Sequence, residues 1–135
     1  MKRLSQFVLL AVLLNFYVSI HAQEVAIIYD ESDPQISFAV DEIVAVAFSR
    51  DGIALDKRSL DGSAEQVFNT NDLDAAVFIG TQKDTVLVDL VAVLGADVAD
   101  LEPEGFSIRF HEQGDTEKIF IIGADSAGAM YGGLE

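Results

Sequence analysis

The feature that most constrains the fold is an alternation, along residues 24–95, between short apolar runs and longer stretches with helical periodicity. Residues 24–30 (EVAIIYD) form an apolar run with polar ends, which is typical of a buried strand. Apolar residues then recur every three or four positions between Ile36 and Ala47, which predicts a helix with one buried stripe. Alternating strands and helices favour helices packed on a mainly parallel sheet, so we expect an α/β fold.

Capping residues indicate where the first helix begins and ends. Asp33 followed by Pro34 is typical of a helix start, because the aspartate can accept hydrogen bonds from free N–H groups and proline lacks such a group. Gly52 is predicted to end the helix, since glycine readily adopts the left-handed conformation that follows a last turn.

The middle of the chain is assigned by the same patterns. Residues 53–55 begin an extended segment, and residues 75–80 (AAVFIG) predict a buried strand. A second helical stripe begins at Asp84 and is ended by Gly95. The polar stretch 56–70 has no pattern that fixes its structure.

A change of pattern after residue 105 predicts a β-hairpin. Phe106, Ile108 and Phe110 alternate with polar residues, which indicates a strand with one solvent-facing side. Residues 111–118 are predicted to be a turn, and residues 119–122 are apolar throughout. A hairpin adds an antiparallel strand, so the small sheet is predicted to be mixed and packed with helices.

The first 22 residues are predicted to be a secretory signal peptide. A basic start at residues 1–3 precedes an apolar run over 7–20, and cleavage is expected after Ala22. The sequence has no cysteine, which excludes disulfides, thiol catalysis and a lipid anchor on cysteine. The domain of residues 23–135 is therefore expected to be secreted or periplasmic, without a membrane attachment after cleavage.

The charge of the chain excludes a further class of partner. Formal net charge is −15, and residues 23–135 keep six basic and 23 acidic residues, a net charge of −17. Nucleic acid is not expected as a partner, because no basic patch is available to displace counterions from phosphates. Solubility outside the cell is the simplest explanation of the acidity.

The closing segment 121–135 (IIGADSAGAMYGGLE) runs from an apolar strand through glycines into a helix, an arrangement found in phosphate-binding loops. Ala129 and Met130, however, stand where the phosphate-loop motif needs lysine and a hydroxyl residue. Asp125 stands where the dinucleotide-binding motif needs its second glycine, and its carboxylate would repel a pyrophosphate. No nucleotide cofactor is predicted.

Acidic residues elsewhere form no recognisable catalytic or metal site. Asp41 and Glu42 lie off the apolar stripe, so we expect them to face solvent rather than to converge on a glycosidic bond. The acids within residues 30–33 fit no calcium-loop spacing. His111 lies at the end of a strand with Ser107 on the same face, but the sequence has no nucleophile elbow. We predict no catalytic, cofactor-binding or metal-binding residue.

Two segments near the end of the chain together resemble a known family. They are residues 104–110 (EGFSIRF) and 118–132 (KIFIIGADSAGAMYG). They resemble the small α/β domain that precedes the catalytic barrel in glycoside hydrolases of families 20 and 67, the β-hexosaminidases and α-glucuronidases. In that domain an E-G-[YF]-x-[IL] strand, a second strand and a G-x-D-x-x-G-x-x-Y-G helix start follow in this order. Upstream of these segments only the order of elements agrees.

The resemblance implies that residues 23–135 are the N-terminal accessory, non-catalytic domain of a secreted glycoside hydrolase, because these families carry the acid and base on the barrel. Asp125 would cap the closing helix, and Met130, Tyr131 and Leu134 would contact the (β/α)8 barrel of the same polypeptide, which this sequence lacks. The glycan substrate would be an indirect partner. The apolar stripe has barely begun where the sequence stops, so we expect a helix cut short.

An independent carbohydrate-binding module is the alternative reading. Such modules stack aromatic side chains on sugar rings, and this chain has no tryptophan. Tyr29, Phe48 and Phe68 are predicted to be core or loop residues, which weakens this alternative without excluding it.

Overall fold

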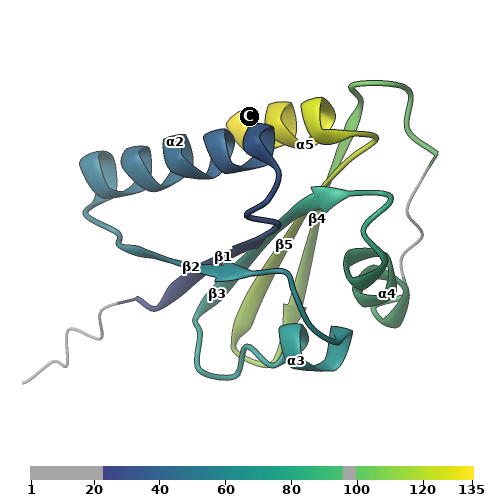
Figure 1. Cartoon of the computed structure of the whole chain (residues 1–135). Coiled ribbons are helices and arrows are strands. Elements are labelled where there is room, and N and C mark those ends of the chain that lie inside the picture. The colour runs from purple at the N-terminus through teal and green to yellow at the C-terminus, as the bar shows by residue number, and fades with distance from the viewer. Residues whose placement is uncertain (1–22, 96–99) are drawn as a thin grey trace, which may run out of the picture.

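The computed structural model describes residues 23–95 and 100–135, so the predicted signal peptide lies outside the described residues. These residues form three layers, with α2 and α5 on one face of a five-stranded sheet and α3 and α4 on the other (Figure 1). The strands are β1 (Val25–Tyr29), β2 (Leu55–Ser59), β3 (Ala75–Thr81), β4 (Phe106–Gln113) and β5 (Thr116–Gly123). The helices are α2 (Pro34–Asp51), α3 (Ala64–Phe68), α4 (Thr85–Val93) and α5 (Ser126–Leu134).

The sheet is mixed, as the hairpin pattern predicted, and its strand order is β2-β1-β3-β5-β4. Strands β2, β1, β3 and β5 run parallel to one another, whereas β4 pairs antiparallel with β5. The hairpin closes through the two residues between Gln113 and Thr116. The predicted turn of residues 111–118 is therefore too long, because residues 111–113 and 116–118 pair as strands. Gly114 lies in the left-handed region (φ 62°), a conformation that glycine adopts without strain in such tight turns. The α/β prediction is therefore confirmed at the level of the mixed sheet and its helices.

Both predicted caps of α2 are confirmed. The Asp33 carboxylate accepts hydrogen bonds from the N–H groups of Gln35 (3.0 Å) and Ile36 (3.2 Å), so two donors of the first turn are satisfied. Gly52 ends the helix at φ 68° and donates its N–H to the Phe48 carbonyl. The helix lies antiparallel to β1, which it follows in the sequence, and its first half buries Ile36, Ala39 and Val40.

The stretch 56–70, left unassigned from the sequence, contains most of β2 and the short helix α3. Ser63 begins α3 through a reciprocal capping box, in which its hydroxyl accepts from the Gln66 N–H and the Gln66 side chain accepts from the Ser63 N–H. Strand β2 has no apolar pattern in its sequence, because it is an outer strand whose residues are mostly polar and exposed.

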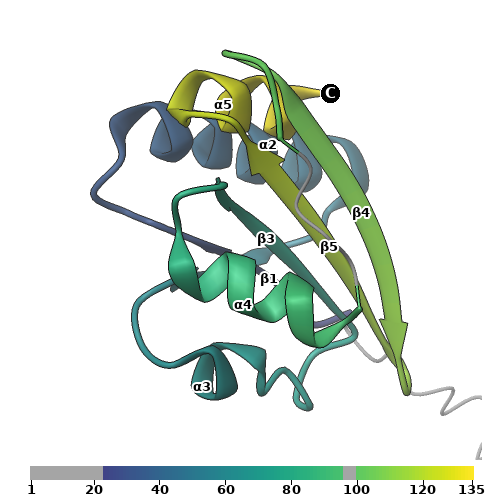
Figure 2. The same ribbon diagram turned by 90° about the vertical axis from the view of Figure 1, so that its right-hand side faces the viewer.

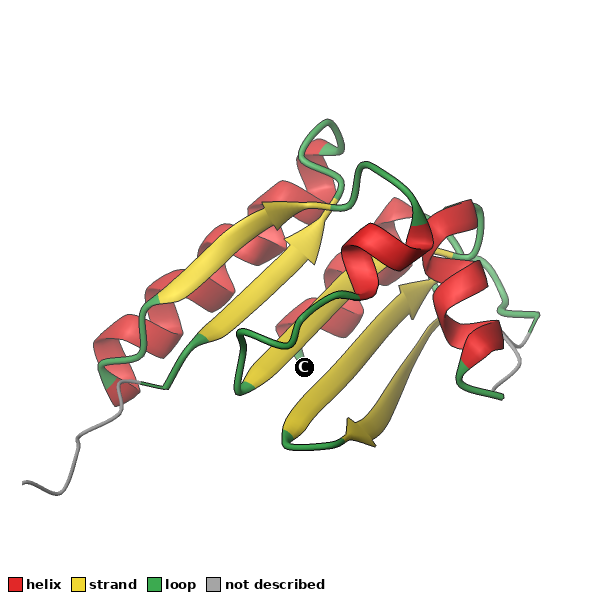
Figure 3. Cartoon of the chain, turned by 90° about the horizontal axis from the view of Figure 1, so that it is seen from below, coloured by secondary structure: helices red, strands yellow, loops and turns green. Residues whose placement is uncertain are grey.

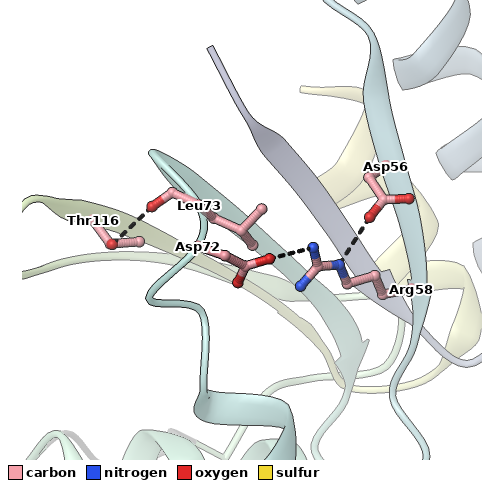
Figure 4. Close-up of polar contacts among 5 residues, drawn as sticks. All are labelled: Asp56, Arg58, Asp72, Leu73 and Thr116. Carbon is pink, nitrogen blue, oxygen red and sulfur yellow. Dashed lines mark hydrogen bonds and ion pairs between the residues drawn. The ribbon is translucent and has the colours of Figure 1, made fainter. Parts of the chain in front are cut away.

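Polar contacts fix the segment between α3 and β3 (Figure 4). Arg58 on β2 donates to Asp56 and to Asp72, each at 2.9 Å, and the Thr116 hydroxyl donates to the Leu73 carbonyl at 2.9 Å. The Asp72 carboxylate has a lowered pKa, chiefly because Arg58 donates to it. These contacts connect β2 and β5 to one loop.

Helices α3 and α4 cover one face of the sheet (Figure 3). The buried residues on this face form a closed apolar core. Phe78 and Phe120 stack on neighbouring strands with their ring centroids 4.8 Å apart, and both are buried. Leu87, Leu90 and Val91 of α4 pack against this face and are also buried. Each such side chain contributes roughly 1.5–3 kcal/mol when it leaves water, so this face accounts for a large share of the stability.

One lysine is buried at the margin of this core. The Lys118 ammonium lies 3.3 Å from the centroid of the Phe68 ring and donates to the Gln113 side-chain oxygen at 2.7 Å. Burial lowers the pKa of Lys118, because leaving water disfavours the charged form. The contact ties β5 to the end of α3.

Candidate functional site

Helix α5 has two faces of different character. Gly128, Ala129 and Gly132 are buried and turn toward the sheet. A Cβ placed on Gly132 would lie 2.8 Å from the Cγ2 atom of Ile121, and one on Gly128 would meet the backbone of Gly105. The helix therefore lies so close to the sheet that this face has to be made of very small residues.

Helix α5 lies along one face of the sheet (Figure 2), and its larger side chains are not among its buried residues. Ala127 and Met130 are half-buried, whereas Tyr131 is 44% and Leu134 48% exposed. The structure thus places the three residues of the predicted interface, Met130, Tyr131 and Leu134, on one side of a single helix. Apolar side chains of this size are not needed on that side for the helix to pack on its own sheet.

The start of α5 is fixed by Asp125, its N-cap residue. The Asp125 carboxylate accepts from the Gly128 N–H at 2.9 Å and from the Glu104 N–H at 3.1 Å, which joins the helix to the segment before β4. These two backbone hydrogen bonds lower the pKa of Asp125, and the one from Gly128 has the larger effect. The Ser126 hydroxyl donates to Asp33, so the starts of α5 and α2 are connected.

The same cap argues against a phosphate site at this helix end. An anion would be bound by the free N–H groups of the first turn, and the Asp125 carboxylate already accepts one of them. The turn also leaves little space beside Gly123, because a Cβ there would meet the backbone of Asp125 and Ala129.

A groove separates the second half of α2 from the end of α5. The two helices contact each other, but α2 has 18 residues and α5 has 9, so the second half of α2 extends past its neighbour. Both apolar and charged residues line the groove. Its lining residues are Glu42, Ile43, Val46, Ala47, Arg50, Asp51, Gly133 and Leu134. Leu134 belongs to both the groove and the outward face of α5, which makes the two surfaces continuous.

Strand β4 adds exposed aromatic side chains at the edge of the sheet. Phe106 contacts the glycine face of α5, since its ring lies 3.0 Å from the position of a Cβ on Gly132. Phe110, four residues further along, is 78% exposed. The apolar alternation of residues 106, 108 and 110 therefore does not bury Phe110. Its strand is the outer one and α5 meets the strand at Phe106, so the Phe110 ring lies beyond the cover of the helix.

The acidic and histidine candidates lie apart from this surface. Asp41 and Glu42 are exposed on α2, as predicted, and Asp41 forms an ion pair with Lys57. Asp30 accepts from the N–H and hydroxyl of Ser32. Within residues 23–95 and 100–135, no group of three His, Cys, Asp or Glu residues is placed to hold a metal ion. His111 lies half-buried on β4 opposite Lys118.

Three aromatic residues were expected in the core or in loops. Tyr29 is buried, and Phe68 packs against the core that α3 and α4 cover. Phe48 differs, because it lies 66% exposed on α2. The prediction for Phe48 is wrong because the buried stripe of α2 does not include its position.

Sequence patterns missed Val46, Gly133 and Phe110 as parts of the exposed apolar surface. Val46 follows Ile43 by three positions, so its helical spacing could have placed it beside the buried stripe. Only the arrangement of α5 against α2 shows that Gly133 lines a groove.

Comparison with known proteins gave no match, either to models of protein families or to curated proteins. Among the helices that the structure describes, none is long and apolar enough to cross a bilayer.

Proposed function

We propose that this chain is the N-terminal accessory domain of a secreted glycoside hydrolase, and that it braces a (β/α)8 catalytic barrel of the same polypeptide. Its part in the reaction is structural. Helix α5 contacts its own sheet through Gly128, Ala129 and Gly132 and presents Met130, Tyr131 and Leu134 to the barrel.

The observation that carries the proposal is the exposure of this second face. A helix with a single apolar face is fully used once that face is buried, but α5 keeps large apolar side chains on the side opposite its sheet contact. Exposed apolar surface of this kind marks sites of protein contact. The groove beside Leu134 extends the surface with Ile43 and Val46 of α2, which gives a neighbouring element a concave apolar seat.

The experiment replaces this surface in the full-length gene product. A double variant, Tyr131→Asp with Leu134→Asp, should lower the thermal midpoint of the two-domain protein and its rate of aryl glycoside hydrolysis, because charge would be placed in the contact with the barrel. Phe48→Asp is the matched control, since Phe48 is exposed on α2 and does not line the groove. It should leave both quantities unchanged.

Two results would count against the proposal. One is a reading frame that continues beyond Glu135 without alternating strand and helix patterns. The other is a double variant that unfolds at the same temperature and hydrolyses at the same rate as the Phe48→Asp control.

An independent carbohydrate-binding module is the second candidate, and the exposed rings of Phe110 and Tyr131 favour it. Such a module would bind soluble glycans in the absence of any barrel. Calorimetric titration of the isolated chain distinguishes the two functions: micromolar glycan binding that is lost in Phe110→Ala supports the module, and no binding supports the accessory domain.

A further inference from the structure

The two outer strands of the sheet are protected to different degrees. Strand β2 has five residues, and its Lys57 and Arg58 form ion pairs with Asp41, Asp56 and Asp72. Strand β4 has eight residues, pairs with β5 without a bulge, and contains neither lysine nor proline. Charged residues, proline and bulges are the means by which proteins keep edge strands from pairing with other chains. By this criterion β4, with two charged residues (Arg109 and Glu112) in eight, is less protected than β2, with three in five.

The hairpin geometry shows which backbone groups of β4 are free. Gln113 and Thr116 flank a two-residue turn, and such a closing pair exchanges both of its N–H···O=C hydrogen bonds. Bonded and non-bonded pairs alternate along an antiparallel ladder, so Phe106, Ile108 and Phe110 direct their N–H and C=O groups away from β5. Among the described strands β4 has no neighbour on this outer side.

A second copy of the strand can use these groups only in certain registers. Outward-directed residues must pair with each other, so an antiparallel pair is centred on one residue of β4 that meets its own copy. The registers differ in what lies opposite Arg109 and Phe110. Centring the pair on His111 places Phe110 opposite Glu112 and forms no aromatic pair. Centring the pair on Arg109 places two guanidinium groups opposite each other, and centring it on Phe110 places Arg109 opposite His111. Centring it on Ile108 places Arg109 opposite Ser107, whose hydroxyl already accepts from Arg109 at 3.1 Å within one strand.

We propose that two copies of this chain associate through the outer edges of their β4 strands, antiparallel and centred on Ile108, to form one continuous sheet. In this arrangement Phe106 of each copy lies opposite Phe110 of the other, and the two Ile108 residues face each other. Phe106 and Phe110, exposed in the single chain, become cross-strand aromatic pairs on one face of the joined sheet. The strand is thus complementary to itself, and a second copy is the partner that it fits. This association does not depend on the proposed accessory function.

The net charge of −15 opposes the association, because the two copies repel each other. Added salt screens this repulsion, so the dissociation constant is expected to fall as ionic strength rises. This direction is opposite to that of a contact held together by ion pairs.

Sedimentation equilibrium of the purified chain, at rising protein and salt concentrations, tests the association. We expect a monomer–dimer equilibrium that salt shifts toward the dimer, and about a tenfold weaker association in Phe110→Lys, which places a charge on the edge and removes the aromatic pairs. Phe48→Lys is the matched control and should associate as the unaltered chain does. A chain that stays monomeric up to about 1 mM, or equal association of Phe110→Lys and Phe48→Lys, overturns the proposal.

The register is tested by cross-linking, for which the natural absence of cysteine is an advantage. Under mild oxidation Ile108→Cys should form a covalent dimer, since residues paired across a ladder have Cα atoms within disulfide reach. Phe110→Cys should cross-link far more slowly, because the two copies of residue 110 are offset along the strands. Faster cross-linking of Phe110→Cys than of Ile108→Cys contradicts the register, and circular dichroism of both variants verifies that the fold is kept.

Discussion

The two faces of the central sheet are built from the same strands but are covered to different extents. On the α3 and α4 side, Phe78, Phe120 and Leu87 are buried and the apolar core is closed. On the α2 and α5 side, the core around Ile27 and Ile79 is buried as well, but Leu134, Tyr131 and Val46 remain exposed at its upper margin. The α3 and α4 side also has an exposed apolar residue, Val93, but the α2 and α5 side has several next to a groove, and the proposed function uses these as a contact surface.

The largest expected effect is a difference in lost stability between a substitution in the buried core and one on the exposed surface of α5. Phe78→Ala should lower the free energy of unfolding of the isolated chain by about 3–5 kcal/mol, because it removes a fully buried ring and leaves a cavity. Leu134→Ala should cost about 1 kcal/mol or less, since half of that side chain is already in water. Urea denaturation measures both, and equal losses would show that the two faces do not differ.

The next effect concerns the contact of α5 with the sheet. Gly128→Ala should destabilise the chain by about 1–3 kcal/mol, because the new Cβ meets the backbone of Gly105, which cannot move aside easily. Gly133→Ala should stabilise it by up to about 1 kcal/mol, since its Cβ would make ordinary contacts at 3.4 Å with Ala39 and Ile43, and alanine favours the helix. A pair of thermal melts compares them. A Gly128→Ala protein as stable as the unaltered chain would be incompatible with the close approach described for Gly128.

A smaller effect is expected at the start of α5. Asp125→Ala removes the cap that joins this helix to Glu104, so the thermal midpoint of this variant should be lower than that of the unaltered chain by a few degrees. Asp125→Ser should recover part of this loss, because serine can also cap a helix. The folded pKa of Asp125 lies below its unfolded value of 3.8. The stabilisation by the carboxylate is therefore fully present above that value and lost as the pH falls through the folded pKa. Melts of the three proteins from pH 2 to 7 check this, and a gap between them that persists unchanged at the acid end would refute it.

The smallest expected effect is a pH dependence of the free energy of unfolding that arises from Lys118, on the face covered by α3 and α4. Burial lowers the folded pKa of Lys118 below its unfolded value of 10.5, so the unfolded chain binds more protons between these two values. The unaltered chain should therefore gain stability relative to Lys118→Met as the pH rises through this interval. Urea denaturation of both proteins at increasing alkaline pH measures the difference, and parallel curves would contradict the burial of the ammonium group.

Those parts of the fold that carry local signals could be predicted from the sequence. The apolar runs of β1 and β3, the hairpin of β4 and β5, and the caps Asp33 and Gly52 are each encoded within a few neighbouring residues. For strand β2 only the extended segment beginning at residues 53–55 was predicted, because the rest of the strand pairs with β1 through its backbone while its side chains stay polar. The capping box of Ser63 and Gln66 was a readable signal for α3 that polar composition obscured.

The candidate surface could be predicted only in part, for a different reason. The spacing of Met130, Tyr131 and Leu134 on one helical stripe is a local property and was visible in the sequence. Whether that stripe or the glycine face contacts the sheet depends on tertiary packing, which places Gly128 against Gly105. The exposure of Phe110 also depends on packing, since it follows from where α5 meets β4.

The central claim, that the outward face of α5 is a contact surface for a further domain, is tested most directly by hydroxyl-radical footprinting. Oxidation of Tyr131 and Met130 would be compared between the isolated chain and the full-length gene product, with exposed Phe48 as the internal reference. The account predicts that Tyr131 and Met130 are oxidised several-fold more slowly in the full-length protein while Phe48 reacts equally in both. Equal oxidation of Tyr131 in the two proteins would contradict it.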